Sequence, residues 1–135
     1  MTSSMKSAKG SIKHNSWDEQ PYREANGQKS TMAVIECALD GNLEAIAPTR
    51  FLMQYLDAAN CHYAGYLLVD GKLDGRRGTF IIHEMGVWED GVASSTWQIV
   101  ASSGTGELKG IAGSGRYAAA KDQTVRYELE YELAD

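Results

Sequence analysis

The amino-acid sequence predicts an all-β protein, an eight-stranded antiparallel β-barrel formed by one domain over residues 1–135. Three observations support this prediction. Asp-Gly dipeptides lie between apolar segments, the last segment alternates apolar and charged side chains, and no segment has the periodicity of an amphipathic helix. Strands joined by tight hairpins can remove their exposed edges by closing into a small barrel. A two-sheet β-sandwich is the alternative.

The strands are predicted in chain order from their alternation. The first spans about 7–16, and the polar segment 18–27 after it is predicted to be the longest loop. The second spans 33–39, where apolar residues occupy every other position. Further strands are predicted at about 43–56, 60–70, 78–88, 92–100 and 114–120. The last strand is the clearest, because charged residues alternate with Val125, Tyr127, Leu129, Tyr131 and Leu133.

Glycine positions predict how the strands are connected. Asp40-Gly41, Asp74-Gly75 and Asp90-Gly91 are expected to form hairpins, since a type I′ turn needs positive φ at both central residues. The glycine-rich segment 104–115 lacks the spacing of a phosphate-binding loop. We expect it to form a sharp, closely packed connection, with a single helical turn within 107–112.

Hairpin pairing predicts which side chains of neighbouring strands lie on the same face. A two-residue turn at Asp74-Gly75 places Gly65 opposite Glu84. A similar turn at Asp90-Gly91 places Glu84 opposite Trp97. The face predicted to form the core then carries Cys61, Tyr63, Gly65, Leu67, Val69, Phe80, Ile82, Glu84, Trp97 and Ile99. Glu84 is the lone charge on this face.

Composition and charge exclude several classes of function. The formal net charge of −5 disfavours a nucleic-acid or anionic membrane surface. The polar start of the chain lacks the apolar stretch of a signal peptide, and no apolar run is long enough to span a membrane. We therefore expect a soluble, cytoplasmic protein in which Cys37 and Cys61 are buried thiols. The spacing of the three histidines predicts no metal site, and no cofactor is expected.

Glu84 is the most specific functional candidate. Among apolar neighbours such as Trp97 and Tyr63, a carboxylate loses hydration, its pKa rises, and it can act as a general acid or base. The alternative is a structural carboxylate bonded to a tyrosine or an arginine. Arg50 or Gln54 is a candidate partner if the even positions of that strand face inward. The opposite orientation is favoured by the apolar residues Phe51, Met53 and Tyr55.

Three functions follow from a barrel of this kind. The first is binding of a small apolar molecule in the lumen, with a lining formed by Tyr63, Glu84, Trp97, Tyr127 and Tyr131. The second is an isomerase or cyclase in which Glu84 is the acid or base. The third is an oligomeric scaffold with a filled barrel. Self-association is expected in any case, because Leu52 and Leu56 would face outward on a strand whose other face is also apolar.

Several segments together resemble a bacterial protein family, domain of unknown function 3224. They occur in chain order as Ser16–Tyr22, Phe51–Leu56, Gly78–Ile82, Ser103–Gly110 and Tyr127–Tyr131. The resemblance implies a calycin-like eight-stranded barrel similar to plant allene oxide cyclases and dirigent proteins, and it implies no established activity. Members often carry Gln-His at the positions of His83 and Glu84, so no catalytic residue is transferred from the plant enzymes.

Overall fold

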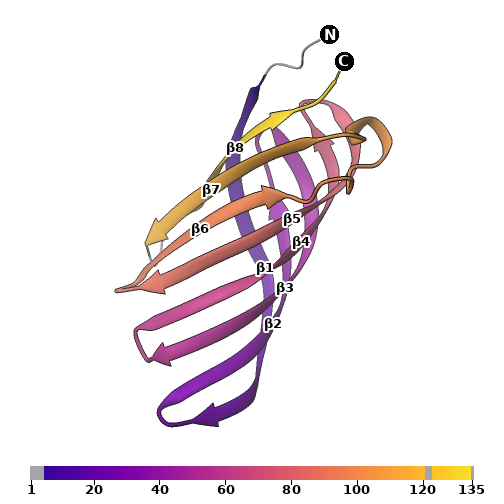
Figure 1. Ribbon diagram of the computed structural model, residues 1–135. Helices are drawn as coiled ribbons and strands as arrows, with labels where there is room; N and C mark the ends of the chain where they lie inside the picture. Colours follow the sequence, from indigo (N-terminus) through magenta and orange to yellow (C-terminus); the bar gives the residue numbers. More distant parts are fainter. Residues whose placement is uncertain (1–4, 121–122, 135) are drawn as a thin grey trace.

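The computed structural model describes residues 5–120 and 123–134; residues 1–4, 121–122 and 135, which the single-domain prediction includes, lie outside this description. Eight antiparallel strands follow one another around a closed ring (Figure 1). The strands are β1 (Lys6–Ala25), β2 (Gln28–Leu39), β3 (Leu43–Asp57), β4 (Asn60–Leu73), β5 (Arg76–Glu89), β6 (Val92–Ile99), β7 (Ala112–Ala120) and β8 (Val125–Glu132).

Pairing between the first and last strands closes the ring. β1 pairs with β8 from Lys6 opposite Tyr131 to Ile12 opposite Val125. Each remaining strand pairs with its neighbours in sequence. The predicted eight-stranded antiparallel barrel is therefore confirmed, and the β-sandwich alternative is excluded because the hydrogen-bonded ring is continuous.

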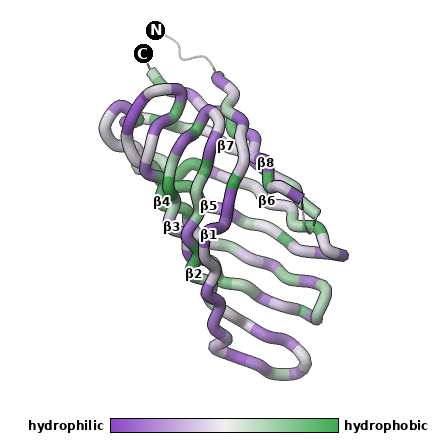
Figure 2. The backbone as a smooth tube through the Cα atoms, turned by 180° about the vertical axis from the view of Figure 1, so that it is seen from behind, coloured by the Kyte–Doolittle hydropathy of each residue, from purple (hydrophilic) through white to green (hydrophobic). Residues whose placement is uncertain are grey.

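The first strand differs most from the prediction. Residues 18–25, predicted as part of a polar loop, continue β1 and pair with β2 (Figure 1). Asn26 and Gly27 form the tight turn, with φ of 56° and 76°. The loop prediction was wrong because two β-bulges, after His14 and after Pro21, allow an irregular polar segment to remain paired. Much of this projecting hairpin is hydrophilic (Figure 2).

The Asp-Gly steps form two kinds of turn. Asp74-Gly75 and Asp90-Gly91 have positive φ at both residues, as a type I′ turn requires. At Asp40-Gly41 only the glycine has positive φ, and the connection between β2 and β3 is longer than two residues. There the Asp40 carboxylate accepts hydrogen bonds from both the backbone N–H and the hydroxyl of Ser11. All three steps join hairpins, but Asp40-Gly41 does not form a two-residue turn.

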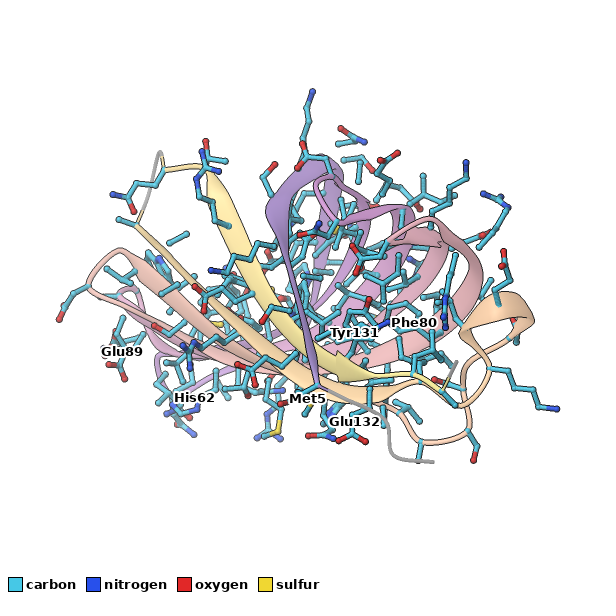
Figure 3. All side chains as sticks on the ribbon, turned by 90° about the horizontal axis from the view of Figure 1, so that it is seen from above. Met5, His62, Phe80, Glu89, Tyr131 and Glu132 are labelled. Atoms are coloured by element: carbon cyan, nitrogen blue, oxygen red, sulfur yellow. The ribbon has the colours of Figure 1, made fainter. Side chains whose placement is uncertain are left out.

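The predicted register is confirmed through the centre of the sheet. Glu84 lies opposite both Gly65 and Trp97, and Leu67 lies opposite Ile82. Nine of the ten residues assigned to the core face are buried, and the tenth, Gly65, is half-buried. In Figure 3, Phe80 and Tyr131 lie among the enclosed side chains, whereas His62 projects outward.

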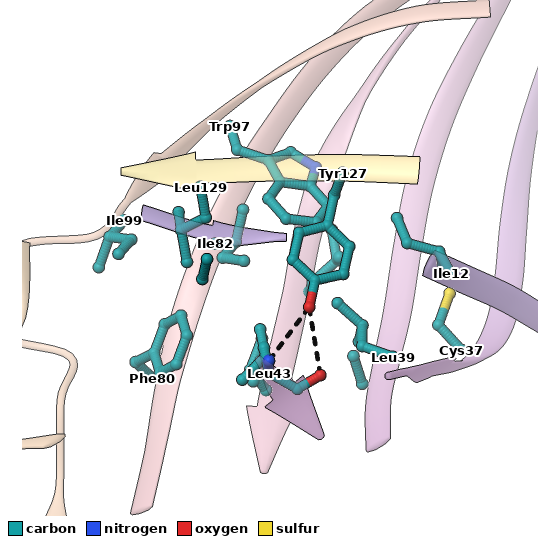
Figure 4. Close-up of a cluster of buried hydrophobic side chains, with 14 of the residues drawn as sticks. Ile12, Cys37, Leu39, Leu43, Phe80, Ile82, Trp97, Ile99, Tyr127 and Leu129 are labelled. Carbon is teal, nitrogen blue, oxygen red and sulfur yellow. Dashed lines mark hydrogen bonds between the residues drawn. The ribbon is translucent and has the colours of Figure 1, made fainter. Parts of the chain in front are cut away.

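One end of the barrel is filled by buried apolar side chains. The buried residues at this end include Leu39, Leu43, Phe80, Ile82, Ile99 and Leu129 (Figure 4). The connection between β6 and β7 covers the same end, where Leu108 of the 3₁₀ turn η1 (Gly106–Leu108) is fully buried. Its Thr105 N–H donates to the carbonyl of Thr79 at 2.8 Å, which confirms the close packing predicted for this glycine-rich segment. Within the described residues, no helix is long and apolar enough to cross a membrane.

The alternation of β8 predicts contrasting effects of two neighbouring substitutions. Leu129 is fully buried and Glu130 is exposed. Leu129→Asp should reduce the free energy of unfolding by several kcal/mol, because it buries a carboxylate without a partner. Glu130→Lys should change it by less than about 0.5 kcal/mol. Urea denaturation followed by circular dichroism measures both, and equal effects would contradict the inward orientation of Leu129.

Candidate functional site

The buried carboxylate of Glu84 is the centre of the candidate site. Its side chain projects from β5 into the barrel and is 2% exposed. One oxygen, Oε1, accepts a hydrogen bond from Trp97 Nε1 at 2.7 Å. The other, Oε2, accepts from the Ser95 hydroxyl at 2.8 Å and the Tyr117 hydroxyl at 2.7 Å. The Ser95 hydroxyl also bonds to that of Tyr63, so four side chains surround the carboxylate.

The electrostatics of this cluster are set by burial. Desolvation raises the pKa of Glu84, and hydrogen bonds from Tyr117, Ser95 and Trp97 oppose that rise without cancelling it. Desolvation and the adjacent carboxylate raise the pKa of Tyr117 well above 10, so its hydroxyl stays protonated at neutral pH. Glu84 is therefore bonded to a tyrosine, as one of the predicted alternatives required, and its pKa is shifted upward, as also predicted.

The partners suggested from β3 do not contact Glu84. The odd positions of this strand face inward, with Phe51 and Met53 buried, whereas Arg50 and Gln54 are exposed. Gln54 instead accepts a hydrogen bond from Ser30 and donates one to Tyr22 on the outside of the sheet. The orientation favoured by the apolar residues of β3 is the one observed.

Gly86 makes room for the polar cluster. It follows Glu84 by two positions and faces the same side of β5. A Cβ atom at Gly86 would lie 2.4 Å from Cζ of Tyr63 and 2.6 Å from Oγ of Ser95. A side chain here would displace the Tyr63 ring, so the glycine allows the two hydroxyls to meet.

A cavity of about 260 Å³ opens beside this cluster. Its lining is largely aromatic and consists of His14, Trp17, Phe51, Met53, Tyr63, Trp88, Ala93, Tyr117 and Val125. Glu84 does not line the cavity, but Tyr117 both lines it and donates to Glu84. Two larger grooves, of about 560 and 700 Å³, are formed mainly by outward side chains on the wall. The 260 Å³ cavity, which is lined mainly by inward side chains, is therefore the candidate binding site.

A second carboxylate faces the same end of the barrel. The bulge after His14 shifts the alternation of β1, so that Trp17 and Glu19 face inward opposite Ile35 and Ala33. Glu19 accepts hydrogen bonds from Trp17 Nε1 at 2.9 Å and from the hydroxyls of two further residues, Thr31 and Tyr55, at 2.6 Å each. The prediction that Glu84 is the lone charge on the core face of β4–β6 is confirmed, and Glu19 adds a second inward carboxylate from β1.

The pKa of Glu19 differs in direction from that of Glu84. Desolvation raises it, but three side-chain hydrogen bonds and the charge of Lys29 outweigh desolvation and lower the pKa below its ordinary value of 4.5. Lys29 also places its ammonium 4.8 Å from the centre of the Tyr55 ring. Glu19 is therefore ionised at neutral pH.

The five residues predicted to line the lumen are divided between two regions. Tyr63 lines the cavity, while Glu84 and Trp97 lie behind it. Tyr127 donates to the carbonyl of Asp40. Its hydroxyl also bonds to the backbone N–H and carbonyl of Leu43 (Figure 4). Tyr131, at the packed end, donates to a carboxylate, that of Asp74.

Sequence reasoning missed several residues of the site, namely Trp17, Glu19, Ser95 and Tyr117. Ser95 could have been found from the predicted register, because it lies two positions before the inward Trp97 on β6. Trp17 and Glu19 could not, since their orientation depends on a bulge that leaves no clear signal in the sequence.

The two cysteines take no part in the site. Cys37 and Cys61 are buried free thiols, as predicted. Desolvation raises the pKa of each to about 11, which makes both thiols unreactive at neutral pH.

The raised pKa of Glu84 predicts how Glu84→Gln changes stability with pH. Between the unfolded pKa near 4.5 and the higher folded pKa, the unfolded chain loses this proton before the folded chain does. The wild type should therefore lose stability relative to Glu84→Gln as the pH rises above about 4.5, and the difference should level off above the folded pKa. Denaturant unfolding of both proteins from about pH 4 to 8 measures this difference. A wild type that gains on the variant with rising pH would show a lowered pKa instead.

Comparison with known proteins places this chain in a family. A family model described as "Protein of unknown function (DUF3224)" matches residues 8–131. The chain is also similar to a crystal structure of a DUF3224-family protein with unknown function from Shewanella oneidensis MR-1. The TM-score is 0.80 at 23% identity, over 98% of this chain and 99% of that one, and this likeness shows the fold alone. No match was found among curated proteins. Since the family model covers most of its length, the chain belongs to the DUF3224 family.

Proposed function

We propose that this protein binds a compact, largely apolar small molecule in the cavity at the open end of its barrel. The observation that supports this function is the cavity itself, about 260 Å³ with a mainly aromatic lining. Pockets for drug-sized ligands occupy roughly 300–1,000 Å³, so this one suits a smaller ligand. A few polar groups in an otherwise apolar cavity are also typical of ligand sites.

The packing of the barrel supports the same function. The end that carries Leu43, Phe80 and Leu129 is filled by side chains. At the opposite end, Trp17 is 45% exposed and Trp88 is half-buried, although both line the cavity. Large aromatic side chains that remain partly exposed around a cavity can gain burial when a ligand enters. The filled-scaffold alternative does not account for this end of the barrel.

Acid–base catalysis of the isomerase or cyclase type is the second candidate function. The hydrogen bond from Tyr117 to Glu84 favours it, because Tyr117 touches the cavity and Glu84 can exchange a proton with it. Glu84 does not reach the cavity directly, so a proton would pass through the Tyr117 hydroxyl. Loss of turnover in Tyr117→Phe with retained ligand binding would identify this role.

Blocking the cavity should remove binding of an uncharged apolar probe. Ala93 lines the cavity from β6, and Ala118 is an exposed alanine on the adjacent strand β7. The fluorescence of N-phenyl-1-naphthylamine should rise on binding to the wild type and to Ala118→Phe. Ala93→Phe should weaken this binding at least tenfold because the new ring fills the cavity. Equal binding by all three proteins would contradict the proposed site.

We also propose that the chain self-associates through the outer wall. Register places Met32, Leu52, Ala64 and Met85 in one outward row across β2–β5. Met32, Leu52 and Met85 are 45%, 52% and 56% exposed, and they form an apolar row without a charge, which suits a second copy of the same surface.

Charge placed in this row should prevent the association. Sedimentation velocity should show an oligomer for the wild type and a monomer for Leu52→Glu. Glu130→Gln on β8, which lies outside the row, should leave the oligomer unchanged. A monomeric wild type at high concentration would rule the association out.

The compartment and the excluded partners follow from the same features. We propose the cytoplasm, since two free buried thiols suit a reducing compartment. A net charge of −5 supports neither nucleic acid nor an anionic membrane as a partner.

A further inference from the structure

We infer that the cavity selects a small organic cation, such as a quaternary ammonium group, over neutral and anionic molecules of the same shape. This inference rests on the proposed binding function and specifies its ligand class. It follows from three features of the cavity: the aromatic faces of its wall, the carboxylates behind that wall, and the engagement of three of the wall's hydrogen-bond donors.

The wall offers several aromatic rings to a ligand. Trp17, Phe51, Tyr63, Trp88 and Tyr117 line one cavity from five different strands. The face of an aromatic ring carries negative potential and attracts a cation within about 6 Å of the ring centre, most strongly for Trp. Cages of such rings are a known means of recognising quaternary ammonium groups.

Two carboxylates lie directly behind this wall. Glu19 accepts the indole N–H of Trp17, and Glu84 accepts the hydroxyl of Tyr117. Both rings therefore donate to a carboxylate on one side and line the cavity on another. A nearby ionised carboxylate adds negative potential, which favours a cation and disfavours an anion in the cavity.

No positive side chain among the described residues lines the cavity. Desolvation lowers the pKa of the one titratable base in the lining, His14, which keeps its imidazole neutral at pH 7. Lys29 neutralises part of the Glu19 charge, but it lies over the Tyr55 ring and does not line the cavity. Its position on an aromatic ring that donates to Glu19 shows a cation held by the same chemistry within this chain.

Three of the wall's hydrogen-bond donors are already engaged. The Trp17 N–H and the Tyr117 hydroxyl donate to carboxylates, and the Tyr63 hydroxyl is bonded to Ser95. A ligand carboxylate would have to displace these bonds and approach the ionised Glu19 carboxylate. An anionic ligand is thus disfavoured beside Trp17 and Tyr117.

Three probes of equal shape test the inference. Choline is the cation, 3,3-dimethylbutan-1-ol is its uncharged counterpart, and 3,3-dimethylbutanoate is the anion. Titrations followed by tryptophan fluorescence and calorimetry should give at least tenfold tighter binding of choline than of the alcohol, which corresponds to about 1.4 kcal/mol. The anion should show no binding at the same concentrations.

Two variants test which residues cause the preference for choline over the alcohol. Glu19→Gln removes one carboxylate charge and Trp17→Leu removes one ring face, and each should reduce choline binding about tenfold while binding of the alcohol changes less than twofold. Glu36→Gln is the matched control, because Glu36 lies exposed on the outer face of β2 and its replacement changes the net charge equally. It should leave the preference intact. Thermal unfolding by circular dichroism verifies that each variant is folded.

The outcomes separate this inference from the proposed function. If the alcohol or the anion binds as tightly as choline, or if Glu36→Gln weakens choline as much as Glu19→Gln does, the cation preference is wrong. Binding of N-phenyl-1-naphthylamine that is blocked by Ala93→Phe would still support a binding cavity in that case. If neither choline nor the naphthylamine binds, the proposed function and the ligand class both fail.

Discussion

A carboxylate enclosed by a barrel must have hydrogen-bond donors, and this requirement organises the centre of the protein. Glu84 has three, Ser95, Trp97 and Tyr117, which come from the two strands that follow β5. Each donor is a side chain of the inner face, so the requirement can be met only if the registers of β5, β6 and β7 are correct. A slip of one residue would turn Glu84 outward and leave its donors buried without an acceptor. The polar cluster therefore stabilises one register. That register also determines which side chains line the cavity beside the cluster.

The centre of the fold could be predicted because its turns carry strong signals. Asp74-Gly75 and Asp90-Gly91 fix the pairing of three strands, and alternation then decides which side chains face inward. The same logic fails on β1, where inward residues such as Glu19 are polar and the period is broken by bulges. One face of this part of β1 is exposed to solvent and the other lines the open end of the barrel. Its sequence therefore shows little alternation of apolar and polar residues. The projecting part of β1 therefore resembled a loop in the sequence.

The candidate site was predictable only in part, for a related reason. Register alone brings Glu84 next to Trp97, and it also predicts that the pKa of the carboxylate is raised by burial. The cavity depends instead on how side chains of different size from seven strands leave space unfilled. Gly86 illustrates this dependence, since its missing side chain decides where the Tyr63 ring lies. Such volumes are a property of the assembled barrel and have no counterpart in the pattern of a single strand.

The division of the barrel into a packed end and an open end separates stability from binding. Leu43, Phe80 and Leu129 bury apolar surface without enclosing a ligand, so they hold the ring closed whether or not the cavity is occupied. The polar cluster lies between the two regions and is joined to the cavity by the Tyr117 hydroxyl. Under the proposed function, a bound cation would favour the ionised form of Glu84 without touching it, and by reciprocity ionisation of Glu84 would strengthen binding of the cation. Ligand affinity and the charge of this carboxylate are then coupled through a single phenol.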